Sequence, residues 1–334
     1  MMRLKTIPAY VAIACLALAG LGQPALARVE KTTVHSASLE GNLEGNSADR
    51  TVYVFLPDSY DKAKGRRYPV VYFLHGYNST ADQYVERTDF EAALKAAGAE
   101  VIVVVPDSMT KWGGSMYSNS PTVGNFEDFI ANDLVAWTDK TFRTVASREA
   151  RGLSGHSMGG YGTLKLGMKR PDVFGALYAM NPCCQIPRPA SSADPKYESW
   201  TVDQALTADW MSRGNFAVAA AWSPNPGKPP FFADLGTSEG KVNELVIAKW
   251  AANSPVAMAS QYLPALRRMS GIAIDTGDTD FVRADDELIH ETLTRFGIAH
   301  DWEIYVGDHG NRVKERFGTH VLPFFAKHLK GSRR

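Results

Sequence analysis

The chain has 334 residues, 45% of them apolar, 10% aromatic and 22% charged, and 36 basic residues balance 36 acidic ones. This length and apolar content suffice for a substantial core. The balanced charge does not point to a nucleic acid or an anionic surface, so neither is expected as a partner.

The first 27 residues have the pattern of a secretory signal peptide. Arg3 and Lys5 precede an apolar run over residues 9–21, and Ala25-Leu26-Ala27 supplies an A-x-A cleavage signal. The run is shorter than the roughly 20 residues of a membrane helix, and no later stretch qualifies. The pattern therefore predicts an exported protein, periplasmic or secreted, without a membrane span.

Cleavage after residue 27 leaves one expected domain, residues 28–334, with 34 basic and 36 acidic residues. Cys15 raises the alternative of a lipoprotein, but Ala12-Ile13-Ala14 before it matches a lipobox poorly. Cys183 and Cys184 are adjacent, and they are either reduced thiols or a strained vicinal disulfide. Their spacing is not that of metal ligands, and no metal is expected.

The N-terminal half predicts strands and helices in alternation. Two apolar segments predict an antiparallel hairpin: residues 34–39 and 50–56, with a turn over 41–47. Residues 69–74 and 101–107 are almost continuous apolar runs, typical of strands buried on both faces. A helical pattern over residues 86–97 separates them, so the two strands are expected to be parallel.

Further elements follow in the same alternating order. Residues 109–123 predict a loop, and the Pro-, Ser- and Ala-rich residues 181–234 predict an insertion over the active site. The other expected helices cover residues 126–142, 243–252 and 255–269, and the other expected strands cover residues 176–180, 272–275 and 301–306. The fold class is therefore α/β: a mostly parallel central sheet with helices on both faces and an antiparallel N-terminal hairpin.

The stretch around Ser157 reads as a nucleophile elbow. Gly155 and Gly159 frame the serine as G-x-S-x-G, between an expected strand over residues 148–153 and an expected helix over 161–170. Glycines permit the tight turn and the close approach of neighbouring backbone. The sequence therefore predicts that Ser157 is an exposed nucleophile at the end of a strand.

A serine nucleophile needs a histidine base and an acid that orients the base. In the α/β-hydrolase chain order the acid and then the histidine follow the serine. His309 comes just after the last expected strand and is the predicted base. Asp280 is the preferred acid and Asp278 the main alternative; Asp275 lies within a strand, and Asp308 is next to the base in the chain.

The oxyanion hole and the pocket complete the predicted site. The expected oxyanion donors are the backbone N–H groups of Met158, which follows the nucleophile, and of Tyr77, in the loop after residues 69–76. Trp112, Tyr117 and Trp222 are predicted to form an apolar pocket wall, with packing of long loops as the alternative.

From residue 50 to residue 329 the chain resembles the putative-esterase (esterase D-like) family of α/β-hydrolases. The resemblance rests on residues 66–76, 117–120, 155–160, 277–280 and 308–309. It implies a triad of Ser157, Asp280 and His309 with Tyr77 and Met158 as oxyanion donors. The family includes S-formylglutathione hydrolases, feruloyl and acetyl-xylan esterases, enterochelin esterases and mycolyltransferases. A signal peptide is a departure from the cytosolic S-formylglutathione hydrolases and argues against glutathione thioesters.

The sequence thus predicts an exported serine carboxylesterase that acts on small esters with short acyl or compact aryl or sugar groups. It requires no metal and no organic cofactor. An acyltransferase that uses the same triad with a sugar or lipid alcohol is the nearest alternative, and a non-catalytic binding protein on the same fold is the other. No feature of the sequence indicates an oligomeric state.

Overall fold

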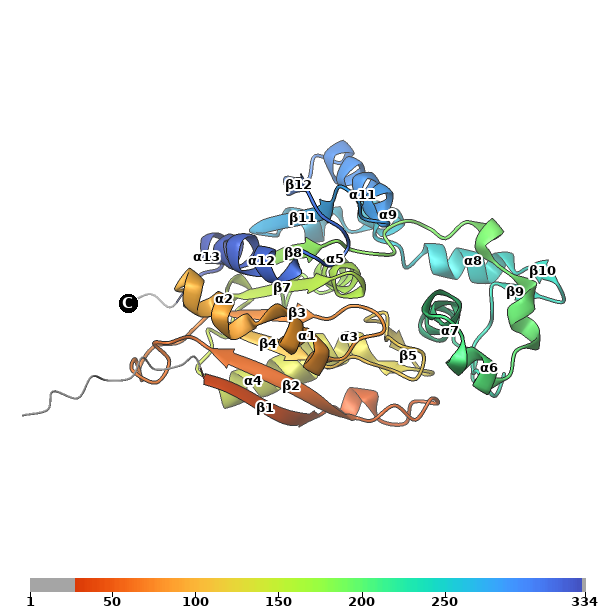
Figure 1. Cartoon of the computed structure of the whole chain (residues 1–334), viewed down its shortest axis with the longest axis horizontal. Coiled ribbons are helices and arrows are strands. Elements are labelled where there is room, and N and C mark those ends of the chain that lie inside the picture. The colour runs from red at the N-terminus through yellow and green to blue at the C-terminus, as the bar shows by residue number, and fades with distance from the viewer. Residues whose placement is uncertain (1–27, 332–334) are drawn as a thin grey trace, which may run out of the picture.

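An eight-stranded sheet runs through residues 28–331, the part of the chain that the computed structural model describes (Figure 1). Its strands, in chain order, are β1 (Arg28–His35), β2 (Asp49–Leu56), β3 (Val70–Leu74), β4 (Ile102–Pro106), β7 (Arg151–His156), β8 (Ala176–Met180), β11 (Gly271–Gly277) and β12 (Asp301–Tyr305). Their spatial order is β1-β2-β4-β3-β7-β8-β11-β12. The signal peptide predicted over residues 1–27 lies outside the described residues.

The strand directions confirm the predicted fold class. β1 pairs with β2 and β2 with β4 in antiparallel fashion, and all other neighbours in the sheet are parallel. The apolar run of β3 explains its central place: Val70, Tyr72 and Leu74 enter the core on one face, while Val71 and Phe73 enter the core on the other.

Helices cover both faces of the sheet. One face carries α1 (Ala81–Thr88), α2 (Phe90–Ala97), α12 (Val313–Arg316) and α13 (Leu322–His328). The other carries α3 (Phe126–Asp128), α4 (Leu134–Thr141), α5 (Met158–Lys169), α9 (Pro255–Met258), α10 (Leu263–Arg267) and α11 (Arg283–Arg295). Two short hairpins lie outside the sheet: β5 (Asn119–Ser120) with β6 (Gly124–Asn125), and β9 (Thr237–Ser238) with β10 (Lys241–Val242).

Residues 181–234 are more regular than the sequence predicts. They contain α6 (Val202–Thr207) and α7 (Trp210–Trp222), and α8 (Glu244–Ala251) follows. Figure 1 shows these three helices gathered beside one end of the sheet. Asp209 caps α7, because its side chain accepts hydrogen bonds from the backbone N–H groups of Met211 and Ser212. Phe216, on the same helix, is buried.

The helix predicted over residues 86–97 is instead two helices. Asp89 ends α1 with a left-handed backbone (φ 55°) and caps α2 by accepting from the N–H of Ala92. Its capping side chain stabilises the break, which hydrophobic periodicity does not reveal.

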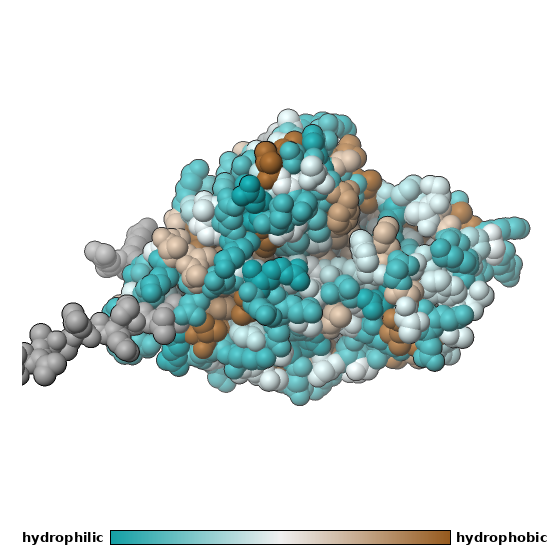
Figure 2. Space-filling view, in the orientation of Figure 1, coloured by the Kyte–Doolittle hydropathy of each residue, from teal (hydrophilic) through white to brown (hydrophobic). Residues whose placement is uncertain are grey.

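The surface of the molecule is more polar than its core. Figure 2 shows that one face of the molecule is mostly hydrophilic, with its apolar residues in separate small groups. Among residues 28–331 no helix combines the length and the hydropathy that crossing a bilayer requires.

Candidate active site

Ser157 lies at the sharp turn between β7 and α5. Its backbone is strained, with φ 57° and ψ −118°, a conformation that non-glycine residues seldom adopt. Both flanking glycines are required by sterics: a Cβ on Gly159 would lie 1.9 Å from the carbonyl oxygen of Leu74, and one on Gly155 would lie 2.5 Å from Gly159. The turn therefore presses α5 against β3 and presents the serine hydroxyl above the sheet.

The structure brings Ser157, His309 and Asp280 into one hydrogen-bonded series. The Ser157 hydroxyl lies 2.9 Å from His309 Nε2, and His309 Nδ1 lies 2.9 Å from both carboxylate oxygens of Asp280. With the proton on Nδ1, His309 donates to Asp280 and its Nε2 is free to accept from the serine. This is the connectivity that activates a serine hydroxyl.

Asp280 is also held by groups other than the histidine. Its Oδ2 accepts from the side-chain amide of Asn181 at 2.5 Å, and its Oδ1 accepts from the backbone N–H of Val282 at 3.0 Å. Burial alone raises the pKa of Asp280, but the hydrogen bonds from His309, Val282 and Asn181 outweigh it and hold that pKa below its ordinary value. The carboxylate is thus charged at neutral pH and fixed in orientation.

The other aspartates considered for this role have different partners. Asp278 is exposed and accepts from the backbone N–H of Gly307 at 2.9 Å. Asp275 is buried in an ion pair with Arg316 at 2.7 Å. Asp308 accepts from backbone N–H groups of its own loop.

His156 adds a contact that sequence reasoning did not assign. It is buried beneath the His309 loop, and its Nε2 lies 2.5 Å from the main-chain carbonyl of His309 while its Nδ1 lies 2.6 Å from the Tyr84 hydroxyl. Because a carbonyl only accepts, Nε2 carries the proton and Nδ1 accepts from Tyr84. Burial is the main reason that the pKa of His156 is lowered to about 3, so this ring is neutral.

The loop after β3 lies beside Ser157, since a Cβ on Gly76 would lie 3.3 Å from the Cβ of the serine. Among the described residues, neither the N–H of Tyr77 nor that of Met158 has a protein acceptor. Two side-chain hydrogen bonds stabilise this loop. The Tyr77 hydroxyl donates to the carbonyl of Trp112 at 2.6 Å, and Arg213 of α7 donates to the side-chain oxygen of Asn78. These contacts hold the loop in place without using either N–H group.

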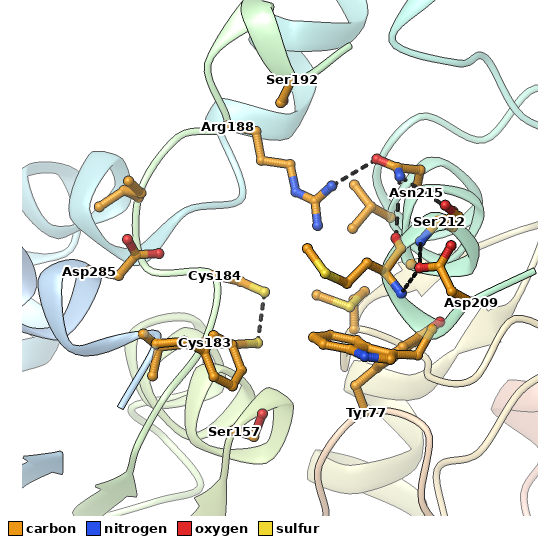
Figure 3. Close-up of a pocket in the computed structure, with 18 of the residues that line it drawn as sticks. Tyr77, Ser157, Cys183, Cys184, Arg188, Ser192, Asp209, Ser212, Asn215 and Asp285 are labelled. Carbon is orange, nitrogen blue, oxygen red and sulfur yellow. Dashed lines mark hydrogen bonds between the residues drawn. The ribbon is translucent and has the colours of Figure 1, made fainter. Parts of the chain in front are cut away.

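A cavity of about 680 Å³ opens above Ser157. Its walls come from the Tyr77 loop, the residues after β8, α7 and the start of α11 (Figure 3). The apolar and aromatic lining residues are Tyr77, Met116, Cys183, Cys184, Ile186, Pro189, Tyr197, Trp210, Met211, Val218, Phe281 and Val282. Residues from the 181–234 segment thus border the same cavity as the serine.

The prediction of a wall made of Trp112, Tyr117 and Trp222 is wrong, because all three are buried and none lines the cavity. The Tyr117 hydroxyl donates to the carbonyl of His75 at 2.8 Å, and the Trp222 indole N–H donates to the Ser118 hydroxyl at 3.1 Å. Tyr117 and Trp222 thus satisfy buried polar groups, as the packing alternative expects.

Of the aromatic residues that line the cavity, Trp210 and Phe281 are the exposed ones, and we call the part of the cavity that they border its mouth. Their ring centroids are 6.2 Å apart, and that of Phe281 is 4.4 Å from the His309 ring. Both side chains remain exposed, Trp210 by 50% and Phe281 by 67%. Phe281 directly follows Asp280 in the sequence, a position that could have marked it as a neighbour of His309.

Cys183 and Cys184 are free cysteines on the cavity wall, with their sulfur atoms 2.7 Å apart. Cys183 also donates its backbone N–H to the carbonyl of Ser157 at 3.1 Å. Among residues 28–331, no group of three or more His, Cys, Asp or Glu side chains is arranged to hold a metal ion.

A family model described as "Putative esterase" matches residues 45–333, nearly the whole described chain. The chain belongs to this esterase family. The match confirms the resemblance inferred from the sequence motifs, and it spans every element that contributes to the candidate site.

Two curated proteins are similar to this chain over part of their length. An esterase of Mycobacterium tuberculosis is 38% identical over 120 residues, which are 35% of this chain and 26% of the relative. An endo-1,4-beta-xylanase/feruloyl esterase of Xylanibacter ruminicola is 31% identical over 143 residues, 40% of this chain and 19% of the relative. The chain therefore matches about a quarter or less of each relative's length.

Two solved structures superpose on this chain over 98% or more of their own length. A ferulic acid esterase superposes with a TM-score of 0.66 at 22% identity and covers 92% of this chain and 100% of its own. An S-formylglutathione hydrolase from Agrobacterium tumefaciens gives a TM-score of 0.64 at 19% identity, with 92% and 98% covered. At these identities the likeness supports the fold alone.

Proposed function

We propose that this protein is an exported serine carboxylesterase that hydrolyses compact esters through an acyl-enzyme. The observation that carries the proposal is the hydrogen-bonded series from Ser157 through His309 to Asp280, with 2.9 Å at each contact. Membership of the esterase family supports the same reaction class. The proposed export rests on the sequence pattern of residues 1–27.

In the proposed mechanism, the Ser157 oxygen attacks the ester carbonyl while His309 Nε2 takes the serine proton. The charged Asp280 carboxylate stabilises the imidazolium that forms. The N–H groups of Tyr77 and Met158 donate to the carbonyl oxygen as it becomes negative, and one such donor contributes roughly 100- to 1000-fold to turnover in related chemistry.

Collapse of the tetrahedral intermediate releases the alcohol, to which His309 returns its proton. A water molecule then attacks the acyl-enzyme, again with His309 as base, and releases the acid and the free serine. The cavity of about 680 Å³ suits a small ester, since ligand pockets commonly range from about 300 to 1000 Å³. An added sugar or lipid alcohol in place of water tests the acyltransferase alternative by product analysis.

The nucleophile is tested with an active-site-directed fluorophosphonate and two variants. The reagent should label Ser157, as peptide mass spectrometry would locate. Ser157→Ala and His309→Ala should each lower the turnover of 4-nitrophenyl butyrate by several orders of magnitude at an unchanged melting temperature, because nucleophile and base act as one unit. Near-normal turnover by either folded variant, or labelling of another residue, would refute the assignment.

A further inference from the structure

Arg188 places a positive charge inside the otherwise largely apolar cavity above Ser157. It lies in the segment Ile186-Pro187-Arg188-Pro189, which borders the cavity. Figure 3 shows its guanidinium directed from this segment toward Asn215 of α7. Prolines on both sides restrict the backbone of the segment, so the side chain starts from a constrained position.

Asn215 of α7 fixes the other end of the arginine side chain. Arg188 Nη1 donates to Asn215 Oδ1 at 3.0 Å, while the amide nitrogen of Asn215 donates to the carbonyls of Met211 and Ser212 at 3.3 Å each. The amide is thereby oriented with its oxygen toward the guanidinium. This contact uses one of the five N–H donors of the arginine.

No carboxylate of residues 28–331 pairs with Arg188 at ion-pairing distance, although two line the cavity. Asp209 is engaged as the cap of α7, where it accepts two backbone hydrogen bonds at 3.0 Å. Asp285 lies on the opposite wall, and burial raises its pKa against the opposing influence of Arg188. Within residues 28–331 the guanidinium therefore makes one side-chain hydrogen bond, to Asn215, and has no acceptor for its other donors.

We propose that Arg188 binds a carboxylate at the end of the ester substrate that is remote from the scissile bond. This inference rests on the esterase function proposed above, and it names the substrate class: an ester with an apolar middle and an anionic far end. The planar guanidinium matches a carboxylate with two parallel hydrogen bonds, which a partly desolvated cavity strengthens.

The carboxylate belongs either to the acyl part or to the alcohol part of the ester, and paired substrates distinguish the two. For the acyl part, monoethyl adipate is compared with ethyl hexanoate. For the alcohol part, 4-(acetoxymethyl)benzoate is compared with 4-(acetoxymethyl)benzamide. Each pair differs chiefly in the charged group, so the ratio of the two kcat/KM values measures recognition of the carboxylate.

Wild-type enzyme should prefer the charged member of one pair. Arg188→Met should lower kcat/KM for that member about tenfold or more while changing the neutral member less than about twofold, since hydrogen bonds to charged groups are the stronger ones. Arg188→Lys keeps the charge and should retain part of the preference. Arg295→Met, at an exposed position on α11 that does not line the cavity, is the control and should match wild type.

Two results would overturn the inference while leaving the esterase function intact: a wild-type preference for the neutral member of both pairs, or an equal loss for both members in Arg188→Met at an unchanged melting temperature. Turnover of the neutral esters no higher than that of Ser157→Ala would instead overturn the proposed function, and the inference with it.

Discussion

The ring of His156 donates a hydrogen bond from Nε2 to the main-chain carbonyl of His309, 2.5 Å away. The elbow therefore carries both the proposed nucleophile, Ser157, and a support for the loop that carries the proposed base, His309. Tyr84 of α1 fixes the tautomer of His156 through its hydroxyl, which donates to Nδ1. His309 is thus held directly by Asp280, which follows β11, and by His156 at the end of β7, and indirectly by Tyr84 of α1.

The first prediction concerns this support. His156→Ala should lower kcat by about 10- to 100-fold and change KM little, because a small misplacement of the base costs turnover more than binding. His156→Gln can still donate to the His309 carbonyl and should recover part of the loss. Steady-state kinetics with 4-nitrophenyl butyrate measure both, and equal kcat values for wild type and His156→Ala would contradict the idea.

A second prediction uses the buried, neutral state of His156. Its pKa is lowered from 6.5 to about 3 in the folded protein, mainly by burial. Below pH 6.5 His156 binds a proton in the unfolded chain but stays neutral in the folded one. The contribution of neutral His156 to the free energy of unfolding is therefore full above pH 6.5 and is lost as the pH falls toward 3. Between pH 6 and 4 the loss approaches about 1.4 kcal/mol per pH unit.

Urea unfolding of wild type and of His156→Gln across this pH range isolates the effect, since every other titrating group is common to both proteins. The free energy of unfolding of wild type should fall more steeply. Parallel curves for the two proteins would show that His156 is not the group responsible.

The third prediction separates the two candidate acids. Asp280→Asn should lose activity by about 10⁴-fold, because the amide no longer fixes the histidine tautomer or stabilises its charged form. Asp278→Asn changes an exposed side chain that contacts Gly307 and should cost little. The comparison is made on kcat at pH 8, and the reverse ranking would move the acid to Asp278.

The fourth prediction assigns substrate selectivity to the cavity mouth. Trp210→Ala and Phe281→Ala should change the ranking of acetyl, butyryl, octanoyl and feruloyl esters, while the melting temperature changes little because both side chains are largely exposed. Trp112→Ala, a change deep in the core, should lower stability by about 3–5 kcal/mol.

Specificity constants and thermal unfolding of all three variants test this division. An unchanged ranking in both mouth variants would place selectivity elsewhere in the cavity. A change of ranking in Trp112→Ala at full stability would restore the pocket role that the sequence analysis assigned to that residue.

The central sheet could be predicted because its signals are local. β3 and β4 are short apolar runs, and both are buried on each face as that pattern implies. The proximity of Asp280 and His309 could be anticipated as well, since each follows a strand of the parallel sheet and such strand ends meet at one edge. These inferences needed only sequence order and the geometry of parallel strands.

The cavity wall could not be predicted in the same way. An aromatic residue in a long loop either lines a pocket or packs beneath it, and the outcome depends on which distant polar group needs a partner. Tyr117 packs because the carbonyl of His75, 42 positions away, accepts from it. Helix α7 was missed within a proline-rich segment, although Asp209 at its start is a recognisable cap.

The distances along the chain between the site residues have a consequence for folding. Ser157 and His309 are 152 positions apart, and His156 and Tyr84 are 72 apart. Contacts between residues so far apart in the chain carry a large entropic cost of loop closure and tend to form late. Regained ester turnover should therefore mark the completion of refolding, and it should lag behind the far-ultraviolet circular dichroism that reports the helices.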